Sequence, residues 1–128
     1  MLDNRYFEIM QESTGSLQVQ VNDTNIGKPI SNVQVAIKNE NGDTVEELIT
    51  DSSGQTPVIN LPTPPVEYSL GEEQSVLPYA IYSIETTTND FRKVFVNGTQ
   101  VLPNSLALQE INTELINTGD TLPIEINI

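Results

Sequence analysis

The sequence of residues 33–50, VQVAIKNENGDTVEELIT, decides the fold class of this chain. In its first part, Val33, Val35 and Ile37 alternate with smaller or more polar residues. An apolar residue at every second position predicts a β-strand with one buried face and one solvated face. We therefore expect this strand to contribute its apolar face to a hydrophobic core.

A hairpin turn is expected directly after this strand, at Asn41-Gly42. Asn-Gly is a strong signal for a tight turn because both residues tolerate a positive φ. The return strand is then predicted at about residues 44–50, with Val45 and Leu48 directed toward the core.

The same alternation recurs on both sides of the hairpin. Further strands are predicted at Leu17–Val21, Thr56–Asn60, Tyr79–Thr86, Phe91–Val96, Leu106–Ile111 and Ile124–Ile128. No segment keeps a helical period over three turns. About seven to eight short strands, with turns about every 8–12 residues, predict an all-β fold, a single antiparallel β-sandwich.

The strand predicted at residues 79–86 can lie in either of two phases. In one phase Tyr79 and Ile81 point inward. In the other phase Ala80, Tyr82 and Ile84 point inward. We favour the first.

Turn residues divide these strands and set the expected domain boundaries. Glycine supplies positive φ, aspartate accepts backbone N–H bonds, and proline fixes the chain direction. The residues expected to shape turns are Pro29, Asn41, Gly42, Asp51, Gly54, Asn97 and Gly98. We predict a partly ordered leader at residues 1–14 and a sandwich domain at residues 15–115. Residues 116–128 are either an edge strand or a linker to an absent domain.

The composition excludes several classes of function. The 128 residues include no His, Cys or Trp, so a Cys nucleophile, a disulfide, a Ser–His–Asp triad and a His- or Cys-ligated metal are impossible. There are 18 Asp and Glu against 5 Lys and Arg, a net charge of −13, which makes nucleic acid a poor partner. The carboxylates fall mainly in predicted turns and are expected to be solvated surface charge. We predict no catalytic residue, no metal site and no cofactor.

The charge also bears on partners. A strongly acidic surface favours a basic protein or a basic face of a neighbouring domain. The pair Arg92-Lys93 should point to opposite faces of one strand, with one side chain pairing with a nearby glutamate. No apolar run reaches the length of a signal peptide or a membrane span, so the chain is expected to be soluble as given.

Several motifs in the first half resemble one superfamily of β-sandwiches. Residues 15–21 read GSLQVQV, residues 28–35 read KPISNVQV, and residues 50–56 read TDSSGQT. This order of strand, proline-led strand and Asp-Gly turn resembles the carboxypeptidase regulatory-like, transthyretin-like superfamily. The resemblance implies a sandwich of that kind.

The second half resembles a narrower family. Residues 61–70 read LPTPPVEYSL, residues 77–82 read LPYAIY, and residues 96–101 read VNGTQV. These stretches resemble the N-terminal pro-region of clostridial spore cortex-lytic enzymes. The resemblance implies a non-catalytic pro-domain that shields, or assists folding of, a peptidoglycan-cleaving hydrolase (a lytic transglycosylase) at the spore or cell envelope. The hydrolase domain itself would lie outside this chain.

An alternative is a stand-alone structural or adhesion module of a larger assembly, such as a cell envelope, a phage tail or a bacteriocin particle. Both hypotheses make the partner another protein: a hydrolase domain in the first, further subunits in the second. The candidate interface residues are Tyr68, Leu70, Tyr79, Tyr82, Ile124 and Ile126.

Overall fold

A computed structural model describes residues 13–64, 79–116 and 122–128 of the chain. Of the leader predicted at residues 1–14, residues 1–12 lie outside these ranges, and β1 already begins at Thr14. Tyr68 and Leu70 also lie outside them. Within them the secondary structure is all strand. The strands are β1 (Thr14–Asp23), β2 (Gln34–Lys38), β3 (Thr44–Ile49), β4 (Ile59–Pro62), β5 (Ala80–Thr87), β6 (Val94–Val101), β7 (Leu106–Thr113) and β8 (Ile124–Asn127).

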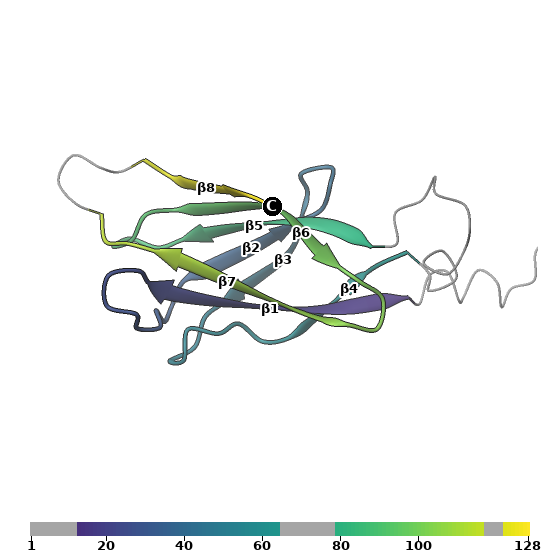
Figure 1. The fold of residues 1–128 in the computed structure, drawn as a ribbon, viewed down its shortest axis with the longest axis horizontal. Coiled ribbons are helices and arrows are strands. Elements are labelled where there is room, and N and C mark those ends of the chain that lie inside the picture. Colours follow the sequence, from purple (N-terminus) through teal and green to yellow (C-terminus); the bar gives the residue numbers. More distant parts are fainter. Residues whose placement is uncertain (1–12, 65–78, 117–121) are drawn as a thin grey trace, which may run out of the picture.

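These strands form two sheets, one of three strands in the order β4-β1-β7 and one of five in the order β3-β2-β5-β6-β8. The sheets pack face to face (Figure 1). The predicted β-sandwich of about seven to eight strands is therefore confirmed, and it is the architecture that the transthyretin-like resemblance implies. The C-terminal segment contributes an edge strand, β8, to the larger sheet.

Two of the strand pairs are parallel, which the sequence did not predict. β1 pairs with β7 and β6 pairs with β8 in parallel, while the other four pairs are antiparallel. The cause is that the chain changes sheets between β6 and β7 and again between β7 and β8. Each crossover places a strand beside one that is distant in sequence, where no hairpin turn sets the direction.

The core lies between the two sheets. On β1, Leu17, Val19 and Val21 are fully buried, as their alternation predicts. They meet apolar side chains of the five-stranded sheet. The buried apolar residues are Leu17, Val19, Val21, Ile30, Val33, Val35, Ile37, Leu61, Tyr82, Ile84, Val94, Val96, Val101 and Ile111.

The phase favoured for residues 79–86 is wrong. Tyr82 and Ile84 point into the core, and Tyr82 is only 5% exposed. The cause is register: Ile84 lies opposite both Ile37 and Val96, so it shares their inward face. The Tyr82 hydroxyl donates a hydrogen bond of 2.6 Å to the carbonyl of Pro62. Tyr82 is therefore a core residue that ties the sheets together, and the prediction that it belongs to an exposed interface is wrong.

The hairpin has the expected turn, but only one of the two expected inward residues on its return strand. The Asn39 N–H bonds the Asp43 carbonyl at 3.0 Å, and Gly42 has φ 86°. Leu48 lies opposite Val35 and packs on the core, whereas Val45 is 41% exposed. Val45 is an odd number of residues from Leu48, so the two side chains point to opposite faces.

The other predicted turn at Asp51–Gly54 forms as expected. One carboxylate oxygen of Asp51 accepts the backbone N–H groups of Ser53 at 2.8 Å and Gln55 at 3.1 Å. Gly54 has φ 71°. A Cβ at Gly54 would lie 2.6 Å from the Val21 carbonyl oxygen. Pro29, the remaining turn residue in this region, forms an isolated bridge to Asn22 beside β1.

Asn97-Gly98 does not form the predicted turn. Both residues lie inside β6, where the pairing with β5 shifts: Tyr82 is opposite Thr99, and Ser83 is opposite Asn97. Gly98 is the extra residue of a β-bulge, with φ 97°. A bulge and a tight turn both require a positive φ, which is why the sequence signal was the same.

Thr50 provides a test of how the hairpin is joined to the preceding loop. Its hydroxyl accepts the Val33 N–H at 3.0 Å and donates to the Ile30 carbonyl at 2.8 Å, and the residue is 3% exposed. We predict that Thr50→Val lowers the free energy of unfolding by about 1–3 kcal/mol, because a buried N–H and a carbonyl lose their partner. Urea denaturation measures this, with the exposed Thr87→Val as control. Equal stabilities of the two variants would contradict the prediction.

Candidate functional site

The structure brings together only part of the predicted interface. Ile124 and Ile126 lie on β8 with their side chains partly buried against the core. Tyr79 is half-buried just before β5, and Tyr82 is in the core. The two isoleucines of β8 are therefore the predicted residues around which a surface site can be described.

Strand β6 holds β8 with contacts at both ends. The Ile124 N–H donates to the Lys93 carbonyl at 2.8 Å, and the Ile128 N–H donates to the Asn97 carbonyl at 2.9 Å. The side-chain amide of Asn97 also donates to Glu125 Oε1 at 3.2 Å and to Asn127 Oδ1 at 3.0 Å. One residue of β6 thus binds the second half of β8 through both its backbone and its side chain.

The bulge at Gly98 makes room for the end of β8. A Cβ at this position would lie 2.9 Å from the carbonyl oxygen of Ile128. Real Cβ atoms do not approach a backbone oxygen so closely, so a side chain here would displace β8. Asn97-Gly98, predicted as a turn, is instead the part of β6 that receives the C-terminal strand.

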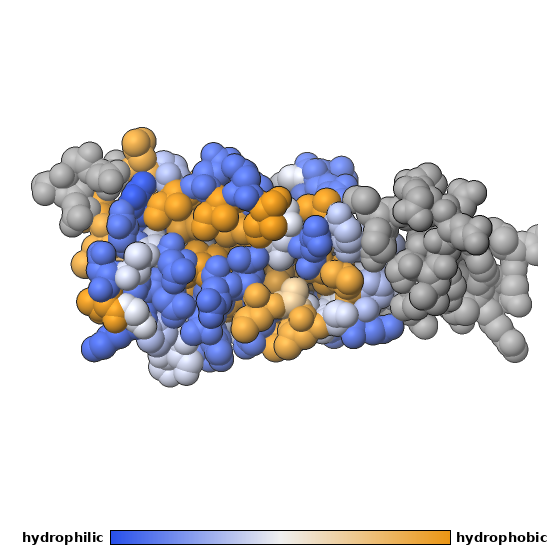
Figure 2. Space-filling view, viewed as in Figure 1, coloured by the Kyte–Doolittle hydropathy of each residue, from blue (hydrophilic) through white to orange (hydrophobic). Residues whose placement is uncertain are grey.

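The two sheets differ in width, and this leaves one apolar margin open. On the inner face of the larger sheet, Ile124 and Ile126 lie opposite Val94 and Val96, beyond the edge strand β7 of the smaller sheet. Figure 2 shows hydrophobic surface beside β8, on the side toward β7. Ile128, next in the same alternation, is 66% exposed. We call Ile124, Ile126 and Ile128 the β8 shelf.

At the opposite margin of the larger sheet, the uncovered inner position is charged. There Glu46 of β3 lies opposite the buried Ile37 and so points to the inner side, where it is exposed. A carboxylate at an uncovered inner position is well solvated, whereas isoleucine is not. The sequence therefore treats the two uncovered margins differently.

Exposed leucines lie close to the open margin. Leu106 and Leu108 of β7 are 60% and 55% exposed on the outer face of the smaller sheet, while Ile111 is fully buried. All three belong to one predicted strand, Leu106–Ile111, for which no inward face is predicted. The signal was present, because Ile111 is an odd number of positions from both leucines. Hydrophobic surface is visible over the start of β7 in Figure 2.

Ion pairs form in two places in the described part of the chain. Glu85 of β5 bonds Lys38 of β2 at 2.7 Å and Lys93 at 2.7 Å. Arg92 bonds Glu114 at 2.6 Å and donates through Nε to the Leu122 carbonyl at 2.8 Å. Arg92 and Lys93 therefore both pair with glutamates, where the sequence predicted a pair for only one of them.

The ammonium groups also shift the Glu85 titration. Hydrogen bonds from Lys38 and Lys93 hold the pKa of the Glu85 carboxyl below its ordinary value. The carboxylate therefore stays ionised between two cations at neutral pH, and the three charges largely compensate one another. The cluster ties β2 and β5 to Lys93, the residue that precedes β6.

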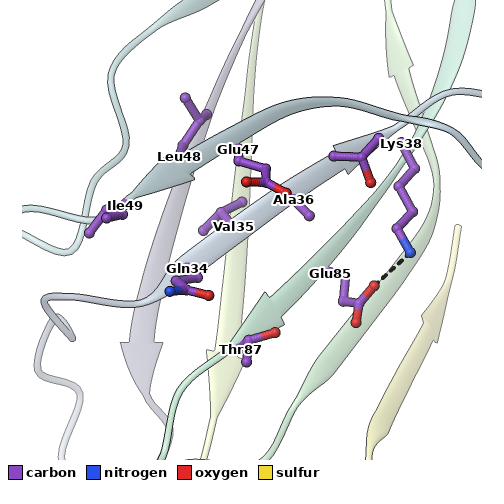
Figure 3. A pocket seen from close by; sticks show the side chains of 10 residues that line it. Gln34, Val35, Ala36, Lys38, Glu47, Leu48, Ile49, Glu85 and Thr87 are labelled. Atoms are coloured by element: carbon purple, nitrogen blue, oxygen red, sulfur yellow. Dashed lines mark ion pairs between the residues drawn. The ribbon is translucent and has the colours of Figure 1, made fainter.

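A shallow depression of about 430 Å³ lies beside this cluster, on the outer face of β3, β2 and β5. Figure 3 shows Lys38 and Glu85 turned toward each other at one side of it. Gln34, Glu47 and Thr87 supply the other polar groups. Within the described ranges no three acidic residues lie close enough together to hold a metal ion. The same ranges contain no helix that could span a membrane.

Comparison with known proteins gives matches only at the level of structure. No protein-family model matches the chain, and no curated protein matches it either. The predicted pro-domain of a cortex hydrolase is therefore not tested by sequence comparison. Similar solved structures come from several kinds of protein.

The Bacillus anthracis TIE protein has a TM-score of 0.56 and 19% identity, covering 80% of this chain and 16% of that protein. A minor pilin of Streptococcus agalactiae has a TM-score of 0.55 and 18% identity, covering 86% of this chain and 48% of the pilin. The 3-chlorocatechol 1,2-dioxygenase of Rhodococcus opacus has a TM-score of 0.54 and 11% identity, covering 91% of this chain and 63% of the dioxygenase. This chain thus spans less than two thirds of each, and the likeness establishes the β-sandwich fold.

The contact between Gly98 and Ile128 gives a test of how β8 is held. We predict that Gly98→Ala destabilises the protein by about 1 kcal/mol more than Gly42→Ala, because both residues have positive φ but only Gly98 is crowded. The amides of Ile124 and Ile128 should exchange faster with solvent in Gly98→Ala. Urea denaturation and amide hydrogen exchange measure these effects. Equal destabilisation by the two substitutions, with unchanged exchange in β8, would show that β8 does not depend on the bulge.

The Glu85 cluster gives a pH test. Because the folded-state pKa of Glu85 is lowered, its contribution to stability is complete above the pKa of the unfolded chain. That contribution is lost as the pH falls through the lower, folded-state pKa. We predict that Glu85→Gln flattens this part of the curve of unfolding free energy against pH. Glu47→Gln on β3, the strand on the other side of β2, is the control. Parallel acid curves for wild type and Glu85→Gln would refute the assignment.

Proposed function

We propose that this chain is a structural, non-catalytic β-sandwich module that joins neighbouring proteins in a larger assembly at the cell envelope. The observation that carries the proposal is the open margin at β7 and β8. There an otherwise acidic molecule leaves isoleucine and leucine side chains uncovered. Exposed apolar residues that gather at one margin are typical of surfaces that contact another protein.

The polar groups of the molecule favour the same function. Glu85, the carboxylate with a lowered pKa, lies between two lysines and is occupied by them. Perturbed carboxylates at catalytic sites face a cleft in which a substrate can bind. Here the nearby depression is shallow and its Lys38 and Glu85 are paired with each other, which suits a surface contact better than a reaction.

The fold supports this proposal without deciding it. A minor pilin shares the sandwich, and pilins are subunits of larger structures, but a dioxygenase shares the sandwich as well. One fold can carry unrelated functions, so the argument depends on the side chains at the margin. The pro-domain role implied by the sequence resemblance is a separate prediction. Binding to a cortex hydrolase, and inhibition of it, would test that role.

The margin can be tested by charge substitution. We predict that Ile126→Glu combined with Ile128→Glu removes the chain from its high-mass assembly in envelope extracts of the organism that carries the gene. A carboxylate cannot be buried at an apolar contact without a partner. Size fractionation of gently solubilised extracts measures the distribution.

The matched control places the same charges at the opposite margin. Val45 and Ile49 of β3 are 41% and 58% exposed, so Val45→Glu with Ile49→Glu should leave the assembly intact. Circular dichroism establishes that both double variants are folded. If the wild-type chain fractionates as a free monomer, or if both double variants behave alike, the proposed function fails.

A further inference from the structure

The free side of β7 presents backbone groups in a defined alternation, and of these the Glu110 carbonyl accepts the side-chain amide of Gln109 at 3.1 Å. The Ser105 carbonyl accepts the Ser16 N–H at 2.7 Å, and the Thr113 carbonyl accepts the Thr24 N–H at 2.8 Å. Odd-numbered residues of this strand therefore face β1. Because successive backbone groups of a strand point to opposite sides, those of Leu106, Leu108, Glu110 and Asn112 face away from β1. Along β7 itself no strand of the described ranges pairs on that side. Just past its end, Glu114 and Ile116 bond Arg92 and Asp90, so the open edge ends there.

The other open edges carry features that discourage pairing. β4 ends in Pro62, and β3 carries Glu46 and Glu47 beside a register shift. β8 is four residues long and follows Pro123. By contrast, β7 has eight residues, no proline and no lysine, and Glu110 is its one charged residue. Proteins usually protect edge strands with proline, charge or short length, so a long unprotected edge requires an explanation.

The β8 shelf provides an apolar surface on which an added strand could pack its inward side chains. A strand paired to the free side of β7 would extend the three-stranded sheet over β8, which β7 leaves uncovered. Figure 1 shows β7 and β8 as the neighbouring edges of the two sheets, and Figure 2 shows hydrophobic surface between them. Inward side chains of the added strand would pack on Ile124 and Ile126. Packed sheets lie about 10 Å apart, the spacing that such side chains fill.

The charges at this margin indicate the chemistry of the added strand. Glu110 is exposed on the outer face of β7, which an added strand would continue, and Arg92 is held by Glu114. A second copy of this chain is an unfavourable donor because each copy carries a net charge of −13. An incoming strand with basic side chains on its outer face is attracted instead.

We propose that β7 is a docking edge for an extended strand of a partner protein in which apolar residues alternate with lysine or arginine. The apolar residues cover the β8 shelf, and the basic residues on the outer face of the added strand lie beside Glu110. The backbone of the partner pairs with Leu106, Leu108, Glu110 and Asn112. This inference rests on the proposed function and names the class of partner.

A designed peptide tests the proposal directly. The probe is a fluorescein-labelled peptide of sequence Lys-Val-Thr-Val-Lys-Val-Thr-Val-Lys, titrated with the full chain and followed by fluorescence polarisation. We expect saturable binding. A peptide with Glu in place of Lys, and one of the same composition without alternation, should each bind about tenfold or more weakly. Equal binding of the alternating and non-alternating peptides would reduce the interaction to net charge and overturn the proposal.

Variants at one position separate the backbone from the side chain. Leu108→Pro removes an N–H that faces the free edge and leaves the pairing with β1 intact. Leu108→Thr removes the apolar side chain and keeps the N–H. We expect about a tenfold loss of peptide affinity for Leu108→Pro and less than about a twofold change for Leu108→Thr. Equal affinities of the two folded variants would overturn the docking edge.

A second variant keeps the test decisive if Leu108→Pro does not fold. Ile126→Ser on the β8 shelf should weaken the alternating peptide about fivefold, while Ile49→Ser at the opposite margin should not. Analytical ultracentrifugation of the chain alone tests the alternative that a second copy of the chain binds this margin. Self-association that is abolished by Ile126→Ser would assign the margin to a second copy and overturn the basic partner.

Failure of this inference is distinguishable from failure of the proposed function. If the chain enters its assembly normally with Leu108→Pro, the docking edge fails and the structural function stands. If the peptide binds as expected but the chain is found only as a free monomer in its organism, the proposed function fails and the docking edge stands.

Discussion

The unequal width of the two sheets is the constraint on which the rest of this structure depends. Three strands cannot cover five, so the inner face of the larger sheet is uncovered at its margins. The residues at the two uncovered margins differ in polarity. At β3 the uncovered inner position holds Glu46, which water solvates, whereas at β8 the positions hold Ile124 and Ile126. The inner position at the β3 margin is therefore well solvated, whereas the apolar positions at the β8 margin are suited to contact with another protein.

Strand β8 exists because β6 is built to receive it. Its four residues contact one neighbouring strand, too little to hold a strand through apolar burial alone. The side-chain amide of Asn97 adds hydrogen bonds to β8. The absence of a Cβ at Gly98 leaves room for the end of the strand. The bulge therefore links a backbone feature in the middle of a central strand to the position of the apolar shelf.

The sequence predicted those parts of the fold that depend on alternation within one strand. β1, β2 and the Asn41-Gly42 turn follow from local pattern, and the structure has them as expected. Which face of residues 79–86 is buried depends on register with two neighbours, which no local pattern contains. For the same reason Asn97-Gly98 could be recognised as a site of positive φ but not as a bulge. Ile124 and Ile126 of the β8 shelf are among the predicted interface residues, but Ile128 is not. The open edge of β7 follows only from the strand order.

The acidic composition and the apolar margin act together. Lys38, Arg92 and Lys93 are all held in ion pairs with glutamates, so they offset little of the surrounding negative field. An apolar contact is non-directional and would accept many partners. The negative field around it disfavours acidic partners and favours basic ones, so burial supplies the attraction and charge supplies the selectivity. A high net negative charge is thus compatible with assembly when the partner is basic, and it keeps copies of the chain apart when no partner is present.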